Sequence, residues 1–135
     1  MTVTLVDRLR RPGPLITVEL RPPRSGLSAA EGMDSWIDLN HSVRNLALKD
    51  IFVFLTDDAV GSQEEENLGH LAANVGSDVP LSRLVPFLTC KHTIEHCLIY
   101  ADRAHSLGFE ALTVVGGDTS VGSPRCVPHS NMLRQ

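Results

Sequence analysis

Four short apolar runs, separated by segments with the apolar spacing of helices, constrain this chain more than any other feature. The runs cover residues 15–19, 51–56, 84–89 and 111–115, and most are rich in β-branched or aromatic residues. Continuous apolar runs of this length are typical of strands buried on both faces of a parallel sheet. The four runs therefore predict four strands of one sheet.

The segments between these runs carry helix start and stop signals. Ser28 and Glu31 have the spacing of a capping box, Ser62 and Glu65 repeat it, and Thr93 can cap a third helix that stops at Gly108. Mostly apolar residues at steps of three and four follow the first and third caps, and they predict two amphipathic helices. Their stripes are Met33, Trp36, Ile37, Asn40, Val43, Leu46 and Ala47, then Ile94, Cys97, Leu98, Ala101, Ala104 and Leu107.

Strands that alternate with single helices indicate an α/β fold with a parallel sheet. Periodicity alone leaves open whether that sheet is doubly wound or closed as a barrel. The chain has 135 residues, of which 42% are hydrophobic and 21% charged. This length and composition suit one globular domain with its own core.

Composition also excludes several classes of function. The net charge of −4 offers no basic surface for nucleic acid, and no apolar run approaches the length of a membrane span. The sequence opens without a secretory signal, so we expect a cytoplasmic protein. The three cysteines lack a Cys-x-x-Cys spacing, which disfavours both a disulfide framework and a structural metal site.

A polar residue stands at or just after the end of each predicted strand. These residues are Glu19, Thr56, Thr89 and Asp118. Because the carboxyl ends of parallel strands meet at one edge of a sheet, we expect them to converge there. Polar residues at strand ends are also consistent with ordinary solvated loops, and Glu19 is the exception.

Glu19 is the strongest candidate for chemistry, as a general acid. It ends an apolar run, and the two prolines Pro22 and Pro23 stiffen the chain that follows it. A carboxyl group at a partly apolar site has a raised pKa, which suits proton donation near neutral pH. The alternative is an ion pair with Arg21 or Arg24, which would keep the carboxylate ionised.

Three segments at the ends of predicted strands, residues 18–23, 88–90 and 115–118, resemble motifs of the methylenetetrahydrofolate reductase family. Residues 18–23, with Glu19 and the two prolines, resemble its Glu-Phe-Phe-Pro-Pro signature. Leu88-Thr89-Cys90 is similar to its His-Leu-Thr-Cys strand end, and residues 115–118 resemble its Leu-Arg-Gly-Asp turn. The matches occur in the family's order, each at the end of a predicted strand.

The resemblance implies the N-terminal half of a TIM (β/α)₈ barrel, with residues 1–135 forming one partial barrel domain truncated relative to the full barrel. It implies FAD as cofactor, NAD(P)H as hydride donor, and reduction of 5,10-methylenetetrahydrofolate to 5-methyltetrahydrofolate in one-carbon and methionine metabolism. Glu19 would be the acid catalyst, and Asp118 would lie near the flavin and the pterin. Thr56, Thr89, Gly117 and Asp118 would bind the cofactor.

The chain departs from the family pattern at three positions. Phe87 replaces a histidine, Gly116 replaces an arginine, and Arg21 stands where phenylalanine is usual. The first two changes remove polar contacts expected to hold FAD, so a non-catalytic relative that self-associates or binds a folate-like ligand is the alternative. Either a second copy or a missing second half of the barrel would have to cover the open sheet.

His92, Glu95 and His96 fit the zinc-peptidase pattern His-x-x-E-His. That pattern requires both histidines on one helical face. If Thr93 caps the helix, His92 lies outside it, so we interpret this segment as an exposed first helical turn and expect no metal.

Overall fold

A computed structural model of the chain describes residues 3–23, 28–56, 64–89 and 93–115. The elements follow in the order α1 (Leu5–Arg10), β1 (Thr17–Leu20), α2 (Ala29–Ala47), β2 (Phe52–Leu55), α3 (Glu64–Asn74), the 3₁₀ turn η1 (Leu81–Arg83), β3 (Leu84–Thr89), α4 (Ile94–Leu107) and β4 (Thr113–Val115). The predicted alternation of strands and helices is confirmed.

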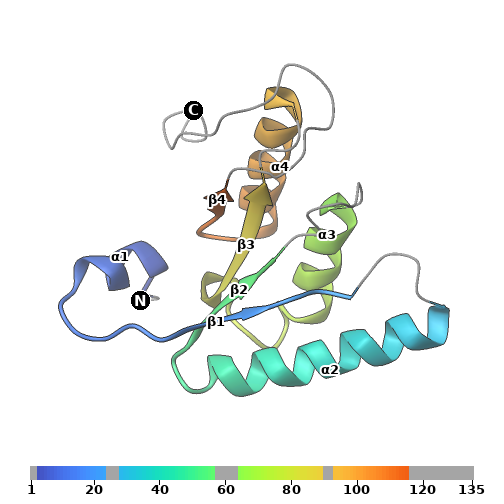
Figure 1. Ribbon diagram of the computed structural model, residues 1–135, viewed down its shortest axis with the longest axis horizontal. Helices are drawn as coiled ribbons and strands as arrows, with labels where there is room; N and C mark the ends of the chain where they lie inside the picture. The colour runs from blue at the N-terminus through green and yellow to red at the C-terminus, as the bar shows by residue number, and fades with distance from the viewer. Residues whose placement is uncertain (1–2, 24–27, 57–63, 90–92, 116–135) are drawn as a thin grey trace.

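The four strands form one sheet in the order β1-β2-β3-β4, and every pairing is parallel. Thr17 to Leu20 lie opposite Phe52 to Leu55, and Thr113 to Val115 lie opposite Phe87 to Thr89. The predicted α/β class with a parallel sheet is therefore confirmed. Strands β1 and β4 are the two edges of this sheet (Figure 1).

The main core lies between the sheet and helices α2, α3 and α4. Its members from the strands include Val53, Leu55, Leu84 and Leu88, which alternation places on one face of the sheet. The helices supply Leu39, Val43, Leu68, Leu71, Cys97, Tyr100 and Ala104. We call this side of the sheet the helix face.

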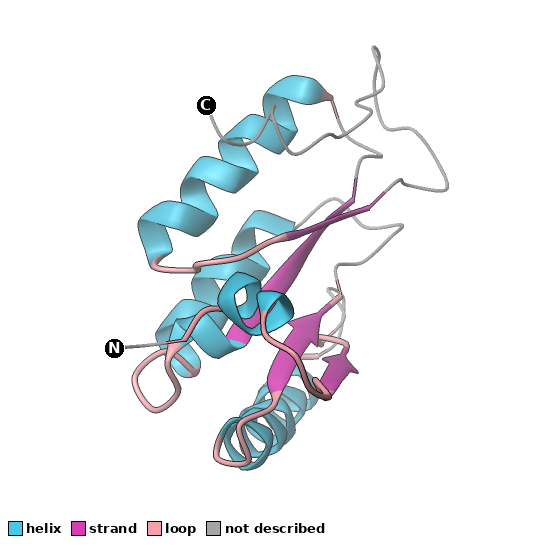
Figure 2. Cartoon of the chain, turned by 90° about the vertical axis from the view of Figure 1, so that its left-hand side faces the viewer, coloured by secondary structure: helices cyan, strands magenta, loops and turns pink. Residues whose placement is uncertain are grey.

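The opposite side of the sheet, which we call the open face, has a much smaller cluster. Leu5 of α1 packs there with Phe52 and Val85, which are fully buried. Leu15, Phe54 and Ala111 extend the cluster as partly buried residues. Figure 2 shows the chain from the side that carries α1, turned by 90° from the view of Figure 1. Among the described elements, α1 is the only helix with a residue in this cluster.

Two of the predicted helix caps are present. The Ser28 hydroxyl accepts a hydrogen bond from the amide of Glu31, and the Glu31 carboxylate accepts one from the amide of Ser28, so the capping box is complete. At the start of α4, the Thr93 hydroxyl accepts a hydrogen bond from the amide of His96, without a reciprocal bond. Ser62 lies outside the described residues.

The two predicted helical stripes are only partly correct. Ile94 and Leu98 of α4 are 40% and 42% exposed, and Met33 and Ile37 of α2 are also exposed. Each helix buries a stripe rotated from the expected one, because the neighbouring strands and helices select which apolar residues face the core. Leu39 and Tyr100, which the pattern missed, occupy those buried positions.

Candidate functional site

The candidate site lies where the parallel strands end. The register aligns Leu20 of β1 with Leu55 of β2, so Thr56 follows directly beside the end of β1. Thr89 is the last residue of β3, and it pairs with Val115, the last residue of β4. The expected convergence of Glu19, Thr56 and Thr89 at one edge of the sheet follows from this register. Gly117 and Asp118 lie outside the described residues.

Glu19 lies on the open face of the sheet. Val18 and Leu20, its neighbours in the strand, are partly buried, and Leu20 packs against the main core on the helix face. Alternation along the strand therefore directs the exposed Glu19 side chain to the opposite side. Within the described part of the chain, Glu19 makes no ion pair with Arg21. Arg24 lies outside it.

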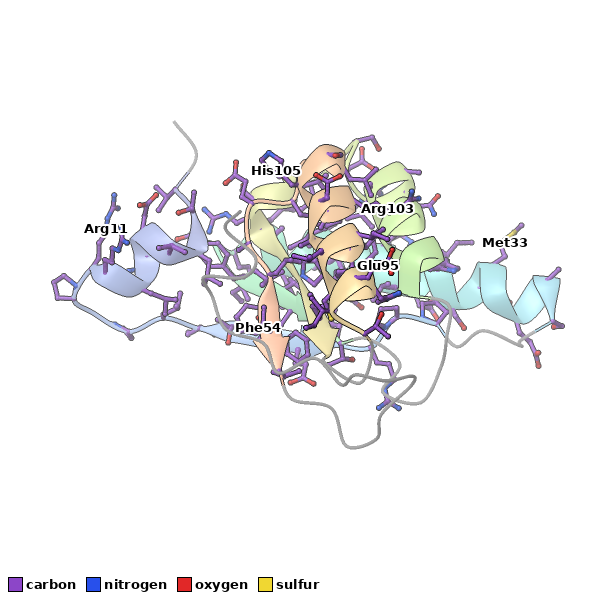
Figure 3. All side chains as sticks on the ribbon, turned by 90° about the horizontal axis from the view of Figure 1, so that it is seen from above. Arg11, Met33, Phe54, Glu95, Arg103 and His105 are labelled. Carbon is purple, nitrogen blue, oxygen red and sulfur yellow. The ribbon has the colours of Figure 1, made fainter. Side chains whose placement is uncertain are left out.

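Two aromatic rings share this face with Glu19. Phe54 is its register partner on β2, and the Phe87 ring on β3 lies 6.0 Å from the Phe54 ring, centroid to centroid, at a tilt of 52°. Both phenylalanines are partly buried. Figure 3 labels Phe54 on the ribbon with the side chains drawn. The exposed Glu19 side chain therefore shares the surface of the sheet with two aromatic side chains.

Thr56 holds the end of β1. Its backbone amide donates to the Leu20 carbonyl at 3.0 Å, and its hydroxyl donates to the same oxygen at a longer 3.4 Å. Leu20 directly follows Glu19, so Thr56 fixes the strand segment that carries the carboxylate. A hydroxyl that donates to the backbone retains its lone pairs, and it can still accept a hydrogen bond from a ligand.

Tyr100 supports the third strand from the helix face. Its hydroxyl donates to the Phe87 carbonyl at 3.2 Å, and its ring stacks on His96 with 6.5 Å between centroids. The buried Tyr100 thus ties α4 to the strand that carries Phe87. This contact was not predicted. The helical spacing of Tyr100 with Cys97 and Ala104 is the signal that identifies it.

The structure describes only part of the segment that fits the zinc-peptidase pattern. Thr93 caps α4, so the helix begins at Ile94, and His92 lies outside the described residues. Among the residues that the structure describes, no three His, Cys, Asp or Glu side chains lie close enough together to hold a metal ion. None of the described helices combines the length and apolar character needed to cross a bilayer.

The aromatic pair was the part of the site that the sequence analysis missed. Phe52 and Phe54 alternate with Val53 and Leu55 in the second run, and that alternation already separates two faces. Only the strand register shows that Phe54 and Glu19 share a face.

The chain was also compared with known proteins. No protein-family model matches the chain, and no curated protein matches it.

Proposed function

We propose that this chain is the N-terminal half of a (β/α)₈ barrel from a cytoplasmic flavin-dependent oxidoreductase similar to methylenetetrahydrofolate reductase. The observation that carries the proposal is the position of Glu19, an exposed carboxylate beside Phe54 at the carboxyl end of an all-parallel sheet. In barrels of this kind, catalytic groups stand at the carboxyl ends of several strands.

The residues at this edge suit a flat, partly apolar cofactor such as FAD. Phe54 and Phe87 offer aromatic surface next to Glu19, and Thr56 retains acceptor lone pairs beside the end of β1. Thr89, Gly117 and Asp118 would complete the cofactor contacts by the family resemblance. FAD, when bound, supplies hydride chemistry that no side chain can supply, with NAD(P)H as the source.

The role of the protein is then to bind the folate, orient it and deliver one proton. Glu19 projects from the sheet face on which the folate would lie, and its carboxyl group would protonate the folate nitrogen as the five-membered ring opens. Proton transfer by a positioned side chain contributes roughly 10²–10⁴-fold in rate. Thr56 would keep the carboxyl group in place through Leu20.

The test separates flavin chemistry from the folate step. The purified protein is titrated with FAD and assayed for NAD(P)H-linked reduction of menadione and of methylenetetrahydrofolate. We expect Glu19→Gln to retain menadione reduction, which needs no folate protonation, and to lose about 10²–10⁴-fold of folate reduction. Glu110→Gln, at an exposed carboxylate just before β4, is the matched control and should leave both rates unchanged.

If the purified protein does not bind FAD, the reductase proposal is wrong. If Glu19→Gln instead lowers menadione reduction and folate reduction equally, Glu19 is not the acid of the folate step, and only the proposed flavin site is retained.

A second candidate is a non-catalytic half-barrel that binds a folate-like ligand without turnover. It is favoured by Phe87, because this residue replaces the histidine of the family and its ring packs against Phe54. Titration calorimetry with tetrahydrofolate in the absence of FAD distinguishes the two. Folate binding by a protein that rejects FAD supports the second candidate, whereas folate reduction with bound FAD excludes it.

A further inference from the structure

Both edges of the sheet lack a partner strand among the described residues. β1 and β4 are the terminal strands of the order β1-β2-β3-β4, and all four strands run in the same direction. An edge strand presents unpaired backbone N–H and C=O groups to a neighbouring chain. A partner that pairs in parallel with both β1 and β4 must itself have two edge strands. Those two strands must run in the same direction as each other.

Among the described residues, only a few cover the open face, and they lie over the first part of the strands. α1 reaches it with Leu5, over Phe52 and Val85. Phe54 and Phe87, nearer the carboxyl ends of their strands, are only partly buried. All-parallel sheets are normally covered on both faces. The partner must therefore bring a second apolar sheet face, as well as two parallel edges.

Within the part of the chain that the structure describes, α4 is the last helix, and it lies on the β4 side of the helix layer. Arg103 of α4 faces α3, because its guanidinium nitrogen lies 3.4 Å from the position that a Cβ on Gly69 would occupy. Ile94 and Leu98 lie roughly 180° and 140° around the helix from Arg103 at 3.6 residues per turn. They are exposed on the flank that faces away from α3. At the other edge, Ile16, directly before β1, is 66% exposed.

We propose that the occupant is a second copy of this chain, related by a two-fold axis parallel to the strands. Rotation about such an axis keeps all eight strands parallel and sets β4 of each copy beside β1 of the other. Eight strands form the barrel whose interior is filled by side chains alone. Closed two-fold assembly is also the commonest form of homo-oligomer. A two-fold axis across the strands would instead pair β1 with β1 in antiparallel fashion and leave both β4 edges open.

The size of the open face indicates where the stability of this dimer must come from. Four strands of about four residues, at spacings of about 4.8 Å and 3.3 Å, present a flat area of roughly 250 Å². A standard interface covers about 800 Å² on each partner. The face alone is too small, so the two β1–β4 seams and the apolar side chains beside them must contribute most of the buried area.

The first test is the mass of the protein in solution. Light scattering on the eluted peak of the whole chain should give twice the chain mass of 14.7 kDa, with dissociation on dilution. A monomer with the far-UV spectrum of an α/β protein would overturn the proposal. The inference deepens the half-barrel part of the proposed function and is independent of flavin. A monomer that binds FAD would therefore refute the dimer and retain the reductase.

The second test distinguishes the proposed dimer, in which β1 of one copy pairs with β4 of the other, from dimers with another interface. Thr17 and Thr113 share the open face, at opposite edges of the sheet, by strand register. Two variants are made in a background that lacks Cys90, Cys97 and Cys126: one carries Thr17→Cys and the other carries Thr113→Cys. The two variants are co-expressed, and the purified mixture is treated with a short bis-maleimide. We expect crosslinks in the mixture and none in either variant alone. Crosslinking of Thr17→Cys by itself would show antiparallel edge pairing and overturn the proposal.

Discussion

Gly108 ends α4 with a backbone conformation that other residues avoid. Its φ of 101° is in the left-handed region, its amide donates to the His105 carbonyl at 3.0 Å, and the next amide, of Phe109, donates to Ala104. This turn closes the helix and directs Phe109 into the core, where it is buried. Only glycine adopts this conformation without a steric penalty from Cβ.

We therefore expect Gly108→Ala to lower the free energy of unfolding by about 1–3 kcal/mol, the usual range for a residue strained into a left-handed conformation. Gly32→Ala is the matched control. Gly32 lies within α2, where an added Cβ meets no atom within 4 Å, so alanine should stabilise by roughly 0.5–1 kcal/mol. Urea denaturation of both variants measures the difference. Equal effects would contradict the proposed role of the Gly108 turn.

Residues with local roles were the ones that the sequence identified well. Gly108, Ser28 and Thr93 act within a few residues of their own position, so spacing alone predicts them. Glu19 and Thr56 were placed at one edge because parallel strands end together. The Phe54–Phe87 contact depends on the pairing of two strands, and no local pattern specifies that register.

At the scale of elements, the reciprocal cap of α2 makes its stability depend on pH. Hydrogen bonds from the Ser28 hydroxyl and then the Ser28 amide hold the pKa of Glu31 below its ordinary value of 4.5. A carboxyl group with a lowered pKa in the folded state stabilises that state when it is ionised. Its contribution is complete above the unfolded pKa and disappears as the pH falls through the folded one.

Ser28→Ala should accordingly cost about 0.5–2 kcal/mol of unfolding free energy at neutral pH, as caps of this type do. The difference between wild type and variant should shrink as the pH falls below 4.5, because protonated Glu31 no longer completes the box. Denaturant titrations at neutral and acidic pH check this, with Ser35→Ala inside the same helix as the control. A difference that stays constant with pH would exclude the contribution of Glu31.

The elements that the sequence misjudged are those set by tertiary packing. α1 was absent from the predicted elements, although Thr4 and Asp7 form a reciprocal cap like that of α2. Its helix has only six residues, and Leu5 holds it against Phe52 and Val85 on the sheet. Ile94 and Leu98 were expected to be buried because they are apolar at helical spacing, but the core lies on another side of α4.

At the scale of the whole molecule, the sheet divides the apolar residues unequally. Among the residues that the structure describes, fourteen buried residues form the cluster on the helix face, and three form the cluster on the open face. Two ion pairs, Arg44 with Asp78 and Arg83 with Asp50, lie between segments that precede the strands. Both are partly exposed to solvent, and exposed pairs contribute little to stability. The helix face should therefore supply most of the stability of the single chain.

This asymmetry gives a comparison between two truncations, Leu84→Ala on the helix face and Phe54→Ala on the open face. Leu84 is fully buried, so its truncation should cost about 2–5 kcal/mol, from lost transfer free energy and from the cavity left behind. Phe54 is partly exposed, so its truncation should lower the free energy of unfolding of the dilute single chain by less, even though its side chain is larger. Urea denaturation over a range of protein concentrations separates the two contributions. If the dimer forms, the cost of Phe54→Ala grows with concentration because the ring then becomes buried against the second copy, whereas the cost of Leu84→Ala stays nearly constant. A larger cost for Phe54→Ala at high dilution would mean that the open face is already covered within one chain.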